Sequence, residues 1–158
     1  MADFRVGIGV DAHALEDGVP LVLGGVELDH PRGLAGHSDG DVLTHALIDA
    51  LLGAAGLGDI GSLFPSGDST PAGVSSLVLL AEAYEQVRNA GFRLVNADCV
   101  LVGEQPRIAG RRDEMRRRLE ETLGEGEVNV RATTTDGLGA TGRGEGLAAQ
   151  AVALLERG

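Results

Sequence analysis

The sequence predicts a single domain of mixed α/β (α+β) class. Three observations favour it: a chain of 158 residues that is 43% hydrophobic, apolar runs with the period of strands, and amphipathic runs with the period of helices. A chain of this length can bury one compact core but is short for two. Twenty-five glycines, many of them clustered, indicate turns lined by backbone.

Residues 4–10 predict the first strand, which leads into Asp11 and His13. Side chains two positions apart on a strand point the same way, so this carboxylate and this imidazole can enter one site. Gly7 and Gly9 leave room for a close approach of other backbone beside that site. The strand therefore offers two potential metal ligands.

Turns separate the next elements. Residues 19–28 predict a β-hairpin, because a Gly-Gly pair interrupts two apolar runs, and residues 30–33 predict a surface turn. Residues 58–76 are also rich in turn residues, and so long a loop in a small domain is usually a lid or a binding loop. Asp59 and Asp68 could hold substrate hydroxyl groups there, although acidic residues in solvated turns are at least as common.

A long helix is predicted to begin at Ser38, because Ser38 and Asp41 have the spacing of a capping box. Leucine and alanine then recur at helical spacing and give the helix one buried stripe. His45 lies beside this stripe, one turn after Asp41 and one turn before Asp49, so the three share a face. A histidine that binds a metal commonly has such a carboxylate behind it.

The second half of the chain alternates helices and strands. Residues 77–89 predict an amphipathic helix, residues 92–102 a mostly apolar strand, and residues 107–123 a helix with a solvated charged face. Cys99, the single cysteine, falls inside the apolar strand. We therefore expect a buried thiol and no internal disulfide.

A glycine-rich segment, residues 133–146, follows the last predicted strand at residues 128–132. A closing helix is predicted to run from it to Leu155. The amides, the threonine hydroxyls and the Arg143 guanidinium would form an anion cradle at the positive end of the helix dipole. The spacings of the Walker loop and of the Rossmann fingerprint are both absent.

Asp11, His13 and His45 together predict a metal centre. A catalytic zinc ion usually has three protein ligands and an open fourth position, whereas structural zinc favours a closed set of thiolates. Any one of these histidines alone would more often be an ordinary core or surface residue. Two patterns occur together in this chain: Asp11 and His13 stand two residues apart, and His37 and His45 form a second spaced pair. Their combination makes metal binding the better interpretation.

The net charge of −11 argues against nucleic acid and anionic membranes as partners, because both would be repelled. An anionic ligand would need a cation to reverse the field locally. All 13 basic residues are arginine, which excludes amine chemistry by lysine. The chain shows neither a leader nor an apolar run of about 18 residues, so we expect a cytoplasmic protein.

Three blocks of the sequence resemble the 2-C-methyl-D-erythritol 2,4-cyclodiphosphate synthase family of the non-mevalonate isoprenoid pathway. They are residues 9–13 (GVDAH), residues 37–65 (beginning HSDGD and ending FP) and residues 132–146 (beginning ATTTD and ending GRGEG). The blocks occur in the family's order and with matching spacing over nearly the whole chain. Three separated blocks make the resemblance specific.

The resemblance implies a homotrimer with three active sites at subunit interfaces. Each subunit would have a mixed four-stranded sheet plus a β-hairpin, with helices packed on one side. The family converts 4-diphosphocytidyl-2-C-methyl-D-erythritol 2-phosphate to 2-C-methyl-D-erythritol 2,4-cyclodiphosphate with release of CMP. A zinc ion (Zn²⁺) and a second ion, Mg²⁺ or Mn²⁺, would assist this small-molecule reaction.

The resemblance also implies roles for individual residues. The zinc ligands fall on the same three residues, His37 and Thr134 match positions that stabilise the transition state, and Asp136 stands where the family has a glutamate for the second ion. The positions that match substrate-binding residues are Asp11, His13, His37, Ser38, Asp59, Ile60, Gly61, Phe64, Pro65, Ser66, Gly67, Asp68, Gly103, Glu104, Gln105, Pro106, Arg107, Thr133, Thr134, Thr135, Asp136 and Arg143.

Two departures from the family pattern matter. Asp136 is one methylene shorter than the usual glutamate, and Ala140 stands where many members have an aromatic residue in the central cavity of the trimer. Binding of an isoprenoid diphosphate in that cavity is therefore not implied.

Two other functions fit the same ligands. A metal-dependent phosphodiesterase or nucleotide hydrolase would activate water and release a linear product. A trimeric ligand-binding module, in which the metal only links a strand to a helix, would have a filled fourth position and no turnover.

Overall fold

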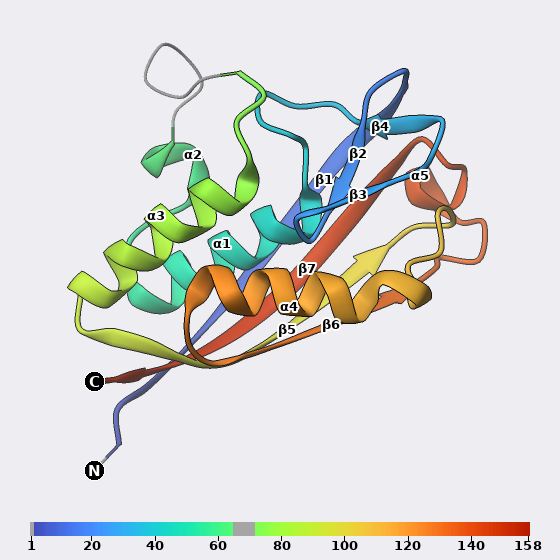
Figure 1. Cartoon of the computed structure of the whole chain (residues 1–158). Helices are drawn as coiled ribbons and strands as arrows, with labels where there is room; N and C mark the ends of the chain where they lie inside the picture. Colours follow the sequence, from blue (N-terminus) through green and yellow to red (C-terminus); the bar gives the residue numbers. More distant parts are fainter. Residues whose placement is uncertain (1, 65–71) are drawn as a thin grey trace.

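A curved mixed sheet of five strands lies against helices on one of its faces, and a two-stranded hairpin forms a separate sheet (Figure 1). The computed structural model describes residues 2–64 and 72–158. The strands are β1 (Phe4–Asp17), β2 (Leu21–Leu23), β3 (Val26–Leu28), β4 (Arg32–Leu34), β5 (Phe92–Val102), β6 (Glu127–Thr133) and β7 (Gly146–Arg157). The helices are α1 (Val42–Ala55), α2 (Ile60–Leu63), α3 (Ser76–Asn89), the 3-10 helix η1 (Ala109–Arg111), α4 (Arg112–Leu123) and α5 (Gly139–Gly142).

The five-stranded sheet has the order β4-β1-β7-β5-β6. Strands β5 and β6 run parallel, and the other neighbouring pairs are antiparallel. The expected sheet of four strands was therefore one strand short, and the helix predicted to close the chain at Leu155 was wrong. Residues 146–157 form the central strand β7 instead, and part of the surface turn predicted at residues 30–33 belongs to the edge strand β4.

Strand β7 resembles a helix in sequence because alanine recurs along it. From Leu147 onward its buried residues alternate along the strand: Leu147, Ala149, Ala151, Ala153 and Leu155. Alanine has the strongest intrinsic preference for helix. Hydrogen bonds to β1 on one side and to β5 on the other override that preference, because tertiary context outweighs local propensity.

Helix α1 packs directly on β1 because glycine leaves room for its backbone. A Cβ atom at Gly9 would lie 1.9 Å from the carbonyl oxygen of Ala46, and one at Gly7 would lie 2.1 Å from that of Ala50. Only a residue without a side chain fits at these two positions. The close approach expected from the glycines is thus confirmed, and it sets the distance between β1 and α1.

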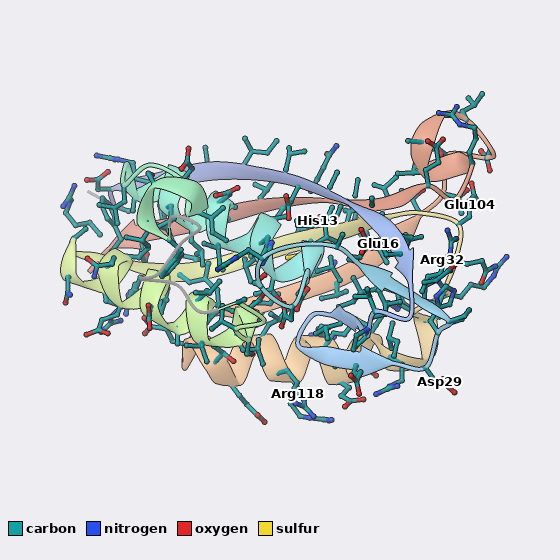
Figure 2. The ribbon with its side chains drawn as sticks, turned by 90° about the horizontal axis from the view of Figure 1, so that it is seen from above. His13, Glu16, Asp29, Arg32, Glu104 and Arg118 are labelled. Atoms are coloured by element: carbon teal, nitrogen blue, oxygen red, sulfur yellow. The ribbon has the colours of Figure 1, made fainter. Side chains whose placement is uncertain are left out.

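Because glycine occupies the inner positions of β1, its larger side chains point outward, away from the helices. These apolar side chains alternate along the strand and are exposed over more than half of their surface: Phe4 (51%), Val6 (69%), Ile8 (65%) and Val10 (60%). Figure 2 shows side chains projecting from this uncovered side of the sheet. An apolar strip of this size on a protein surface commonly marks an interaction site.

Asp41 begins helix α1 and ties it to the hairpin. Its carboxylate accepts from the amide of Thr44 at 3.0 Å, and from the turn amides of Gly24 at 2.9 Å and Gly25 at 2.7 Å. The predicted start of the helix at Ser38 was therefore wrong, and so was the capping box. The predicted hairpin is confirmed as β2 and β3, with both turn glycines at positive φ.

The remaining elements agree with the sequence. The helix predicted at residues 77–89 is α3, the strand at 92–102 is β5, the strand at 128–132 lies within β6, and the helix at 107–123 is η1 followed by α4. Cys99 is completely buried in β5. None of the described helices is long and apolar enough to span a membrane.

Candidate functional site

The three predicted metal ligands meet where β1 faces α1. Asp11 and His13 come from β1, and His45 comes from α1. His13 Nε2 lies 2.8 Å from Asp11 Oδ2, His45 Nδ1 lies 3.1 Å from the same oxygen, and the two nitrogens are 3.3 Å apart. One atom from each side chain is thus within 4.8 Å of the others, close enough to share one ion.

The charges at this cluster suit a divalent cation. Burial of Asp11 opposes ionisation, but the hydrogen bond from His13 and the adjacent imidazole of His45 lower the pKa of its carboxyl to about 2. The hydrogen bond to Asp11 in turn raises the pKa of His13. A carboxylate and two imidazoles with converging lone pairs are the donor set of a catalytic zinc site, and the residues therefore fit the metal that the sequence predicts.

The support behind His45 differs from the prediction. His45 Nε2 lies 2.8 Å from Ser76 Oγ and 2.9 Å from Ser38 Oγ. Asp41 caps α1 instead, and Asp49 accepts from the first amide of α2 at 2.7 Å. The sequence did not indicate Ser76, because it begins a helix that is separated from His45 by a long loop.

A pocket opens beside the metal ligands. It is lined by the three ligands and by His37, Ser38, Ile60, Gly61, Phe64 and Leu79, which brings together residues predicted from separate segments. Asp59 caps the short helix α2 by accepting from the Ser62 amide at 2.8 Å. The predicted residues Pro65, Ser66, Gly67 and Asp68 lie outside the described part of the chain.

A second pocket lies at the carboxyl ends of the parallel strands β5 and β6. Its lining includes six of the predicted substrate-binding residues: Gly103, Glu104, Pro106, Arg107, Thr133 and Thr134. Glu104 accepts from the Gly137 amide at 3.0 Å, which fastens the loop after β5 to the loop after β6. Ligands commonly bind at the carboxyl ends of strands in α/β sheets.

Comparison with known proteins identifies the family. The model of the YgbB family matches residues 4–156. The chain belongs to the YgbB family. It is 56% identical over 153 residues to the 2-C-methyl-D-erythritol 2,4-cyclodiphosphate synthase of Moorella thermoacetica, with 96% of this chain and 94% of that protein covered. It is 54% identical over 158 residues to the synthase of Aromatoleum aromaticum, with 99% and 96% covered.

Solved structures of the same kind superpose closely on this YgbB-family chain. The bifunctional IspDF of Campylobacter jejuni gives a TM-score of 0.95 at 41% identity, covering 100% of this chain but 43% of that larger protein. A 2C-methyl-D-erythritol-2,4-cyclodiphosphate synthase solved in a form bound to CDP gives 0.87 at 40% identity, with 96% of this chain and 99% of that chain covered.

The glycine-rich segment of this YgbB-family chain is built differently from the predicted cradle. Residues 146–157 form a strand, so the expected long helix and its dipole are absent from this part of the chain, where only the four-residue α5 is helical. Asp136, at a φ of 52°, accepts from the Thr134 hydroxyl at 3.1 Å, and Thr135 Oγ1 lies 3.0 Å from Thr141 Oγ1. Arg143 pairs with the neighbouring Glu145.

The two pockets of this YgbB-family chain have no lining residue in common. Figure 2 shows His13 near the middle of the molecule and Glu104 at one end of it. The sequence predicted residues of both pockets for a single substrate. Within one chain, however, the candidate metal ligands and the second pocket lie in separate places.

Proposed function

We propose that this chain converts 4-diphosphocytidyl-2-C-methyl-D-erythritol 2-phosphate to 2-C-methyl-D-erythritol 2,4-cyclodiphosphate with release of CMP. The reaction would supply the non-mevalonate route to isoprenoid precursors. The observation that carries the proposal is the convergence of Asp11, His13 and His45 beside an open pocket, in a chain that matches the synthases over nearly its full length. The match to a CDP-bound synthase supports a cytidine ligand.

Asp11, His13 and His45 would hold a zinc ion, which supplies a Lewis acid for a phosphate oxygen when it is bound. The 2-phosphate of the substrate is itself the nucleophile, so the chain needs no nucleophilic side chain. The task of the protein is to hold the two ends of one flexible molecule in line, which can contribute about 7–11 kcal/mol at its upper range. For this reason the site consists of metal ligands and of side chains that position the substrate.

Further residues would position and neutralise the phosphates. We assign His37, which lines the metal pocket, and Thr134, which lines the second pocket, to the charge that develops on the phosphate oxygens. Asp136, in the loop after β6, would hold Mg²⁺ or Mn²⁺, which would supply positive charge to neutralise phosphate oxygens. Its carboxylate is exposed and next to Thr134, which supports this role.

We further propose a homotrimer whose active sites lie between subunits. The separation of the two pockets within one chain supports this arrangement, because one substrate would then bridge the metal pocket of one subunit and the second pocket of its neighbour. The exposed apolar strip of β1 (Phe4, Val6, Ile8 and Val10) would be buried at that interface. Sedimentation of the purified protein would test the stoichiometry.

Incubation with the cytidyl substrate and Mg²⁺, followed by phosphorus NMR, tests the reaction. We expect CMP and a cyclic diphosphate. A linear product would indicate a hydrolase, and no turnover by the zinc-loaded protein would indicate a binding module. The variants His13→Ala and His45→Ala should lose both zinc and turnover, whereas Asp136→Ala should keep zinc and lose most of its dependence on Mg²⁺ or Mn²⁺. Full activity of a metal-free His13→Ala protein would refute the mechanism.

A further inference from the structure

A hydrogen-bonded chain of two side chains stands behind His45, on the side away from Asp11 and His13. Ser76 Oγ lies 2.8 Å from His45 Nε2 and also donates a hydrogen bond to Asp39 Oδ1. Ser76 is completely buried, and His45 is only 8% exposed. Water therefore has little access to this end of the imidazole, and the protein must satisfy it.

The donors and acceptors in the hydrogen bonds from His45 through Ser76 to Asp39 follow from the chemistry of these side chains. An ionised carboxylate only accepts, so the single hydroxyl proton of Ser76 points to Asp39. The lone pair of Ser76 is then left for His45, and it can be satisfied only by a proton on Nε2 of the imidazole. Ser38 Oγ accepts from the Gly40 amide at 3.3 Å and lies 2.9 Å from the same nitrogen, and it can share the Nε2 proton when its own hydroxyl proton points elsewhere.

Asp39 is itself held in place by backbone. Its Oδ2 accepts from the Ser76 amide at 3.0 Å, and its Oδ1 accepts from the Asp41 amide at 3.1 Å. Its own amide donates to the Val74 carbonyl at 3.1 Å. The carboxylate thus cannot turn away from Ser76 without breaking bonds to both the loop before α1 and the start of α3.

We propose that Asp39 and Ser76 are positioning residues that hold His45 as the Nε2–H tautomer, so that its Nδ1 lone pair faces Asp11 Oδ2 and His13 Nε2 at the metal site. The inference rests on the proposed zinc site. In the zinc-free protein Asp11 competes with the pair, because its carboxylate would draw a proton onto Nδ1 at 3.1 Å. We expect the hydrogen bond to Ser76 to prevail, because its 2.8 Å contact to His45 is shorter than the 3.1 Å contact to Asp11 and Ser76 is completely buried.

The first test locates the proton on the imidazole ring of His45. Long-range proton–nitrogen NMR of the zinc-free protein, with His45 in its neutral form, reports which ring nitrogen carries the proton. We expect the proton on Nε2 in the unmodified chain. In Asp39→Asn, the amide nitrogen of the new side chain can donate to Ser76 and reverse its hydroxyl, so the proton should move to Nδ1. A proton on Nδ1 of the unmodified chain would overturn the inference.

The second test is zinc affinity, measured by competition with a coloured chelator. Loss of a group that orients a metal-binding histidine typically weakens metal binding by about 10–100-fold, and we expect a loss of that size in Ser76→Ala and Asp39→Asn. Ser75→Ala is the matched control. Ser75 caps the same helix by accepting from the Leu77 amide at 3.3 Å, but it is exposed and belongs to a different hydrogen bond.

Unchanged affinity in Ser76→Ala, or an equal loss in Ser75→Ala, would overturn the inference. An equal loss in Ser75→Ala would show that zinc affinity depends on the start of α3 in general and not on the Ser76 hydroxyl. Failure of the proposed reaction gives a different pattern. A protein that binds zinc and keeps the proton on Nε2, yet forms no cyclic product, would refute the proposed function and leave the positioning role intact.

Discussion

The tight packing of α1 on β1 at Gly9 leads to a specific prediction for the variant Gly9→Ala. The new Cβ would lie 1.9 Å from the carbonyl oxygen of Ala46, whereas ordinary contact begins near 3.4 Å, so α1 must move away from β1 by about 1.5 Å. His45 is the residue before Ala46 and would move with it. Ligands of a metal site must keep their distances within about 0.2 Å, so zinc binding should be lost.

The same overlap should reduce stability. Overpacking a well-packed interior typically costs about 1–3 kcal/mol, and we expect Gly9→Ala to lower the free energy of unfolding by that amount. Urea denaturation measures the stability, and competition with a chelator measures the zinc affinity. Gly53→Ala is the matched control in α1, because its Cβ would lie 3.9 Å from the nearest atom, the oxygen of Ile8.

Gly53→Ala should keep wild-type zinc affinity and gain about 0.5–1 kcal/mol, since alanine replaces glycine within a helix. If Gly9→Ala unfolds at the same urea concentration as the wild type and binds zinc equally well, the close approach of α1 to β1 does not control the metal site.

Three further predictions concern single buried groups. Tyr84 is the only tyrosine, and the chain has no tryptophan, so ultraviolet absorbance follows its ionisation alone. Burial and the hydrogen bond to Glu125 raise the pKa of Tyr84 to about 12. The stability that the protonated Tyr84 hydroxyl contributes should be complete below pH 10 and be lost as the pH rises through 12. A midpoint of the absorbance titration near pH 10 would contradict this. Burial raises the pKa of the Cys99 thiol to about 12, so a thiol reagent should label it only after unfolding, and fast labelling of the native protein would count against the fold. Asp41→Ala should cost more than the ~2 kcal/mol of a strong helix cap, because the hairpin turn also loses its acceptor; urea denaturation showing a loss below ~1 kcal/mol would argue otherwise.

The candidate metal site could be predicted from the sequence because its chemistry is local. Asp11 and His13 are two residues apart on a strand, which fixes their shared direction, and His45 lies on a helix of clear apolar period. The details of its support could not be predicted. Ser76 reaches His45 only through the packing of α3 on α1, which no pattern in a single segment encodes.

The topology of the sheet was harder to predict for a physical reason. The alanine-rich residues 146–157 satisfy the local preferences of a helix, and only two neighbouring strands make them a strand. Strand β1 was predicted from the sequence, but which of its two faces is buried was not. Apolar side chains normally mark the buried face of a strand, whereas here Gly7 and Gly9 mark it and the apolar residues face outward.

The central position of β7 has a consequence for the newly made chain. β1 and β5 both pair with it, and β7 is translated after either of them. Until it emerges from the ribosome, two long strands have open edges that invite association with other chains. Pairings between such distant segments also form slowly. The candidate metal ligands on β1 would thus acquire a firm scaffold only once synthesis has passed residue 157. A chaperone that shields open strand edges should therefore raise the yield of this protein.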